Sequence, residues 1–154
     1  MHALCTIVGS RLQDIESALE YYHENEWDYA TIGGRYSNLI PVGKKSKVIH
    51  TGSAWPDMER EAFPYPERMQ GNENCKYVNI ARIRNINQEE CLRILQGGGL
   101  SPFEPYTLIL CHEDGGFEWM DWEESPPEVK AVYRAFLNDT RRKSWWMAVV
   151  DYHY

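Results

Sequence analysis

Two glycines and an arginine stand together among aromatic residues in the segment EWDYATIGGRYSNLI, residues 26–40. Glycine allows positive backbone φ angles and close approach by another group. An arginine guanidinium is a planar donor suited to phosphate or carboxylate, and it also stacks on aromatic rings. The segment therefore predicts a pocket for an anion, a nucleotide or a partner protein. The predicted lining residues are Trp27, Tyr29, Gly33, Gly34, Arg35 and Tyr36. The alternative is a tight turn whose arginine is held by an aromatic ring or by a carboxylate such as Asp28.

A carboxylate and an imidazole lie two residues apart near the end of the sequence, at Asp151 and His153. Alternate residues of a strand point to the same side, so this pair could act as acid and base or bind a metal. His112 is the third candidate catalytic residue. A metal site needs a further ligand that no spacing identifies, so we expect neither a metal nor a cofactor. Nucleotide-binding loops, nucleophile elbows and zinc-protease motifs are absent from the sequence, which favours a non-enzymatic function.

The chain is acidic, with 23 Asp and Glu residues against 16 Lys and Arg residues and a formal net charge of −7 at pH 7. Non-specific binding to nucleic acid requires Lys and Arg to neutralise phosphates, so we do not expect direct nucleic-acid binding. Four carboxylates in and after the segment 106–122 predict an acidic face that a basic partner could bind. They are Glu118, Asp121, Glu123 and Glu124. A solvated edge of the protein is the simpler interpretation of the same residues.

The four cysteines have none of the spacings that are typical of zinc sites. Three of them lie in apolar runs, where cysteine behaves as a small buried hydrophobic residue. The N-terminal apolar run is too short for a signal peptide, and no segment reaches the ~20 apolar residues of a membrane span. These features predict a reduced, cytoplasmic protein that does not bind membranes.

Apolar periodicity predicts an α+β fold, with residues 1–154 forming a single two-layer domain. We expect a mixed or mostly antiparallel sheet, with about three helices on one face. Expected strands lie at residues 2–8, 27–32, 36–42 and 76–86, in a hairpin over 106–122 and in the last segment, 144–154. Expected helices lie at residues 11–24, after Asn87 and after Ser125. Residues 44–75 contain Pro, Gly and scattered charges, which predicts a long loop or insertion.

Two of the helix starts have clear capping signals. Asn87 is followed three residues later by Glu90, a spacing typical of a helix N-terminus. Ser125 precedes two prolines and Glu128, which predicts a capping serine and proline in the first turn of the next helix.

The glycine–arginine segment also resembles a known pattern. Residues 27–36 are similar to the W-D-x-Y-x-I-G-G-R-W signature of an uncharacterised family of small phage and prophage proteins. ARIRNI (81–86), the hairpin segment 107–122 with its D-G-x-W ending, and the C-terminal V-V-D-x-H match further segments of this family in the same order. Tyr36 replaces the usual tryptophan, Ala30 replaces a common aromatic residue, and the histidine that often follows D-G-x-W is missing. These departures argue against a catalytic role for the hairpin.

The resemblance implies no reaction, but it implies an accessory protein of a phage or mobile element. Such proteins commonly redirect or disarm host machinery by binding. The leading hypothesis is an inhibitor that docks on a host defence protein. CRISPR effectors are the first candidates, because an acidic, aromatic-rich surface is complementary to their basic nucleic-acid channels.

Two other functions are carried as alternatives. One is a binding protein that sequesters a nucleotide signal, and the other is a small metal-dependent hydrolase or nuclease that uses Asp151, His153 and His112. A homodimer is a further expectation.

Overall fold

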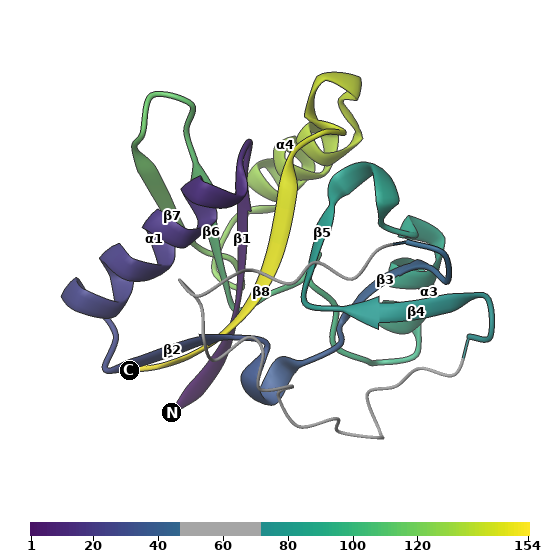
Figure 1. The fold of residues 1–154 in the computed structure, drawn as a ribbon, viewed down its shortest axis with the longest axis horizontal. Helices are drawn as coiled ribbons and strands as arrows, with labels where there is room; N and C mark the ends of the chain where they lie inside the picture. Colours follow the sequence, from purple (N-terminus) through teal and green to yellow (C-terminus); the bar gives the residue numbers. More distant parts are fainter. Residues whose placement is uncertain (47–71) are drawn as a thin grey trace.

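Two strands from opposite ends of the sequence pair at the centre of the main sheet. The computed structural model describes residues 1–46 and 72–154. Strands β1 (His2–Gly9) and β8 (Trp146–His153) are antiparallel neighbours along their whole length. Nearly all of their side chains are buried, because both faces of the sheet are covered. Both chain ends therefore lie at the same end of the molecule (Figure 1).

Four more strands complete this six-stranded mixed sheet. Strand β6 (Thr107–Cys111) runs parallel to β1, and β7 (Phe117–Asp121) pairs with β6 as an antiparallel edge strand. On the other side of the central pair, β2 (Tyr29–Ile32) and β5 (Ile80–Arg82) pair with different halves of β8. The α+β class and the mixed sheet are thus confirmed.

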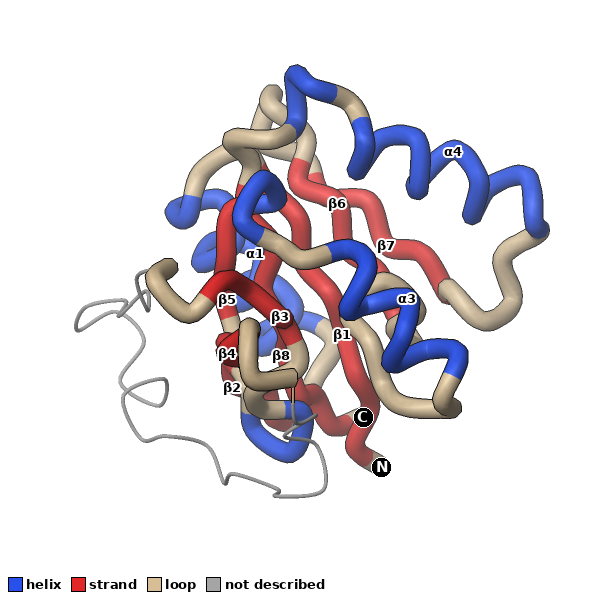
Figure 2. Tube along the Cα trace, turned by 90° about the vertical axis from the view of Figure 1, so that its right-hand side faces the viewer, coloured by secondary structure: helices blue, strands red, loops and turns tan. Residues whose placement is uncertain are grey.

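The helices are divided between the two faces of the sheet, whereas the sequence analysis placed all of them on one face. Helix α1 (Leu12–Asn25) packs on the face that carries the odd-numbered residues of β1 from Ala3 to Ile7. Helices α3 (Gln88–Gln96) and α4 (Pro127–Asn138) pack on the opposite face. Figure 2 shows α3 and α4 together in front of the sheet, with α1 behind its strands. The difference arises because β1 has apolar side chains on both faces of the sheet, and helices must pack on both faces to bury them.

A second, two-stranded sheet joins the α3 and α4 side of the core. It pairs β3 (Ile40–Gly43) with β4 (Cys75–Val78) in antiparallel fashion. The expected strand at 76–86 is therefore two strands in two different sheets. Between β4 and β5, Asn79 accepts a hydrogen bond from the Val149 amide through its backbone oxygen, at 3.0 Å. Most of the predicted loop at 44–75 lies outside the described residues.

One of the two predicted helix caps is confirmed. The Asn87 side chain accepts a hydrogen bond from the Glu90 amide at 3.0 Å and begins α3. The serine cap predicted for α4 is wrong, because Pro126 occupies the cap position and Pro127 begins the helix. The Ser125 hydroxyl instead donates to the Asp121 carbonyl at 2.8 Å. This bond ties the helix start to the end of the hairpin.

The four cysteines are free and buried. Burial raises the pKa of the Cys91 thiol and of the Cys111 thiol to about 12, so both remain protonated at neutral pH. Within the described parts of the chain, no helix is long and apolar enough to span a bilayer.

The central position of β1 makes its side chains sensitive to truncation. Ile7 is fully buried, so Ile7→Ala should lower the free energy of unfolding by about 2–5 kcal/mol through lost burial and a residual cavity. Val132 on α4 is 71% exposed, and Val132→Ala should change stability by less than about 0.5 kcal/mol. Urea denaturation followed by far-UV circular dichroism measures both values. Similar losses in the two variants would contradict this packing.

Candidate functional site

Gly33 and Gly34 form the turn that leads from β2 into the short 3-10 helix Gly34–Tyr36. Their φ angles are 78° and 55°, in the region that favours glycine. A Cβ atom on Gly34 would lie 2.6 Å from both Cβ and Oδ2 of Asp151, which is closer than real Cβ contacts. The Gly33 amide also donates to the Val149 carbonyl at 2.8 Å. The two glycines therefore hold the turn directly against β8.

Asp151 lies beneath this turn, with only 1% of its surface exposed. One carboxylate oxygen, Oδ2, accepts a hydrogen bond from the Arg35 backbone amide at 2.9 Å. The other, Oδ1, lies 2.7 Å from Nδ1 of His2. A buried carboxylate needs such donors because desolvation disfavours its charged form. Asp151 thus links the glycine–arginine turn, β8 and the start of β1.

The Asp151 and His153 side chains share one side of β8, as their spacing predicts, but each has a different partner. His153 pairs through Nδ1 with Oδ1 of Asp28 at 2.7 Å. The rings of His2 and His153 lie 5.2 Å apart. His2 was not among the predicted site residues, because its place beside Asp151 depends on the pairing of β1 with β8. The contact of the His2 imidazole with Asp151 could be predicted only by assuming the register in which β1 pairs with β8.

His112 does not join this group. Its Nε2 atom lies 3.0 Å from Oε2 of Glu118 at the turn of the β6–β7 hairpin. The β1 residue paired with Asp151 is Leu4, whereas the hairpin end of β6 lies beside Val8. Those two levels are about 13 Å apart along a strand. No cluster of three or more His, Cys, Asp or Glu side chains suited to a metal occurs within residues 1–46 and 72–154.

The aromatic residues predicted around Arg35 lie in different places. The Tyr36 hydroxyl donates to the His2 carbonyl at 3.2 Å, and the Tyr29 ring meets the His2 ring edge-on at 5.7 Å. Trp27 is buried on the α1 face, where it stacks on Tyr152 with ring centroids 4.5 Å apart. Tyr152 and Asp151 are consecutive residues of β8, so their side chains point to opposite faces of the sheet. Trp27, which packs on Tyr152, therefore lies on the opposite face from Asp151 and the glycine–arginine turn.

The Arg35 side chain is exposed. Its guanidinium makes no hydrogen bond or ion pair with any other described residue, so neither Asp28 nor an aromatic ring of the described chain holds it. The backbone geometry explains the two glycines as part of the scaffold. Of the six residues predicted to line the pocket, Tyr29 and Arg35 are the exposed ones.

The four residues of the predicted acidic face are all exposed. Glu118 and Asp121 lie on the edge strand β7, and Glu123 and Glu124 follow in the turn before α4. Between the first two, Trp119 donates from Nε1 to Oδ1 of Asp121 at 3.0 Å. Glu118, Asp121, Glu123 and Glu124 together are called the acidic edge.

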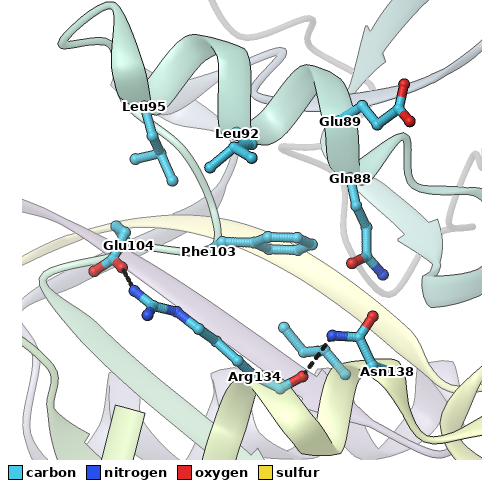
Figure 3. A pocket seen from close by; sticks show the side chains of 9 residues that line it. Gln88, Glu89, Leu92, Leu95, Phe103, Glu104, Arg134 and Asn138 are labelled. Atoms are coloured by element: carbon cyan, nitrogen blue, oxygen red, sulfur yellow. Dashed lines mark hydrogen bonds and ion pairs between the residues drawn. The ribbon is translucent and has the colours of Figure 1, made fainter. Parts of the chain in front are cut away.

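An apolar pocket of about 440 Å³ lies between α3 and α4. Figure 3 shows the Phe103 ring between Leu92 of α3 and Arg134 of α4, with Leu95 above and the Glu104–Arg134 ion pair at one side. The pocket presents mainly carbon atoms and could accept an apolar side chain. It contains none of the residues that the sequence analysis selected.

Protein-family models, curated protein sequences and solved structures were compared with this chain, and none of them matches it.

The contact between Gly34 and Asp151 can be tested with two glycines of positive φ. Gly34→Ala combines an unfavourable backbone conformation with overlap on Asp151, whereas a Cβ on Gly98, at φ 80°, meets nothing within 4 Å. Gly98→Ala should cost about 1–2 kcal/mol from the backbone alone. We expect Gly34→Ala to cost at least about 1 kcal/mol more, measured by urea denaturation. An equal loss of unfolding free energy in the two variants would show that the turn does not depend on the close contact between Gly34 and Asp151.

Proposed function

We propose that this protein is a non-enzymatic accessory protein of a phage or mobile element that counters a host defence system by binding. In this proposal it docks through its acidic edge on the basic surface of a defence effector, and RNA-guided CRISPR effectors are the first candidates. The observation that carries the proposal is the exposure of all four acidic-edge carboxylates on and beside an edge strand.

The position of these charges supports a docking role. Within the described sheet, β7 pairs only with β6, so its outer side is accessible to a partner. Carboxylates along such an edge produce a negative potential, which raises the rate of encounter with a basic surface and disfavours acidic partners. A CRISPR effector offers a positively charged channel that normally holds nucleic acid.

Apolar side chains accompany the acidic edge. Phe117, Trp119 and Met120 are partly exposed on the same strand. Aromatic side chains often supply much of the binding energy at protein interfaces, while surrounding charges select the partner. Strand β7 therefore combines the two kinds of residue that a specific protein interface uses.

The geometry gives less support to an enzyme. The three candidate catalytic residues lie at two ends of the sheet, and the two oxygens of Asp151 are already engaged by Arg35 and His2. A general acid or base must reach its substrate within hydrogen-bond distance. The burial and the two hydrogen bonds of Asp151 are explained by its role in holding the turn and the start of β1 in place.

The geometry also gives less support to a nucleotide pocket at the glycine–arginine turn. The backbone amides of Gly33, Arg35, Tyr36 and Ser37 all donate to acceptors within the chain. They are therefore not free to bind phosphate, unlike the amides of a phosphate-binding loop. A phosphate at this turn would also lie near the Asp151 carboxylate.

The resemblance of residues 27–36 and of the C-terminal segment to the phage and prophage family supplies the biological context of the proposal. A protein of 154 residues with an acidic surface suits an inhibitor that works by occupying a site.

Charge reversal tests the proposal in bacteria that are immune to a phage through one type of RNA-guided effector. The protein should restore plaque formation against at least one effector type. Glu123→Lys with Glu124→Lys should lower that restoration by about tenfold or more, because attraction becomes repulsion. Binding to the purified effector should weaken in parallel, and should also weaken as salt is raised.

The matched control is Glu73→Lys with Glu89→Lys, which changes the net charge equally at two exposed residues away from the acidic edge. This control should retain inhibition. An equal loss of inhibition in the two double variants would show that inhibition depends on net charge and not on the position of the acidic edge. Full inhibition by the acidic-edge variant, or no protection from any effector type by the wild type, would overturn the proposal.

A further inference from the structure

A pocket with aromatic walls lies on the α1 face, beside the acidic edge. It has a volume of about 250 Å³ and is formed where the ends of α1, β7 and β8 meet. Its aromatic lining residues are Trp27, Tyr106, Trp119, Tyr152 and Tyr154. It is therefore a different place from the glycine–arginine turn on the opposite face.

The rings of this pocket are set at different angles to one another. Trp119 meets Tyr152 nearly edge-to-face at 74°, with ring centroids 6.0 Å apart, whereas Trp27 lies almost parallel to Tyr152. Hydrogen bonds hold two of the walls in place. The Tyr152 hydroxyl lies 2.7 Å from Oγ1 of Thr107, and Trp119 is bonded to Asp121. The walls are thus positioned by the fold before any ligand binds.

The charge around the pocket is negative. Glu26 and Asp121 complete its lining, both are exposed, and none of its described lining residues is Lys, Arg or His. The hydrogen bond with Tyr154 raises the pKa of Tyr106, and the carboxylates of Glu123 and Asp121 raise it further, so this hydroxyl stays neutral at physiological pH. Aromatic faces are themselves negative because of their quadrupole.

Aromatic faces together with carboxylates favour a particular class of ligand. A cation within about 6 Å of a ring centroid is attracted to the face of the ring, and tryptophan gives the strongest attraction. A primary ammonium is strongly hydrated, and Mg²⁺ or Ca²⁺ requires several oxygen ligands. An alkylated ammonium has an apolar surface that rings can cover. The pocket is also smaller than the roughly 300–1,000 Å³ of common ligand sites, so it suits a head group.

We propose that this pocket binds an alkylated ammonium group, with the rings covering its methyl groups and Asp121 and Glu26 balancing its charge. The site requires no partner protein, so the inference goes beyond the docking function. The group could belong to a free choline-like molecule or to a methylated lysine side chain, since both present the same head.

Titration of the purified protein, with no effector present, separates this site from the docking proposal. Choline and its uncharged carbon isostere, 3,3-dimethylbutan-1-ol, are compared by isothermal titration calorimetry and tryptophan fluorescence. Choline should bind at least about tenfold more tightly, because only it carries the charge. A short peptide with trimethyl-lysine is the third probe, and tighter binding of either cation supports the site while identifying its source. No binding of any cation, or equal binding of the isostere, overturns the proposal.

Two substitutions connect the binding to this pocket. Asp121→Asn removes the charge but keeps an oxygen that can accept the Trp119 hydrogen bond, and Trp119→Leu removes a wall. Each should weaken choline binding by about tenfold. Glu24→Gln and Tyr21→Leu change exposed residues of α1 outside the pocket and should leave binding unchanged. If Trp119→Leu fails to fold, Asp121→Asn decides alone. Equal affinity of Asp121→Asn and wild type would contradict the site.

Discussion

The antiparallel pairing of β1 with β8 is the interaction on which the rest of the structure depends. Every other strand of the main sheet pairs with one of these two strands or, in the case of β7, with a strand that does. Their side chains also supply both hydrophobic clusters, one on each face. Because the two strands come from opposite ends of the sequence, their pairing is a long-range contact. Pairing of strands that are distant in sequence slows folding, because the entropy of closing the long loop between them must be lost before the pairing can stabilise the fold.

Asp151 shows how this pairing gives a structural role to a residue whose type and spacing predict a catalytic one. In isolation, an aspartate two residues from a histidine suggests an acid–base pair. In the fold, it is a buried acceptor between the His2 ring and the Arg35 amide, beneath a turn whose positive φ angles and close contacts favour glycine. Its two hydrogen bonds offset the cost of burying a carboxylate. The two glycines and the aspartate are therefore parts of one structural unit, although 116 residues separate Arg35 from Asp151.

Features encoded by nearby residues were predictable from the sequence. The first helix, the hairpin and the Asn87 cap depend on local periodicity or on spacings of a few residues. The placement of Trp27 was not predictable, because its stacking on Tyr152 depends on the register of β2 with β8. The division of the helices between the two faces likewise depends on strand order. For the candidate site, the partners of the predicted residues are set by pairing between distant segments, as Asp151 with His2 shows.

The acidic edge has a consequence for how the protein behaves at high concentration. An edge strand presents unpaired backbone groups that another copy of the same strand could extend into a growing sheet. When two such edges approach each other, the carboxylates of Glu118 and Asp121 on each copy repel those on the other. The same charges that would attract a basic partner therefore protect the chain against self-assembly into aggregates. A variant that neutralised the edge would lose this protection, and its loss of solubility could be mistaken for a loss of binding.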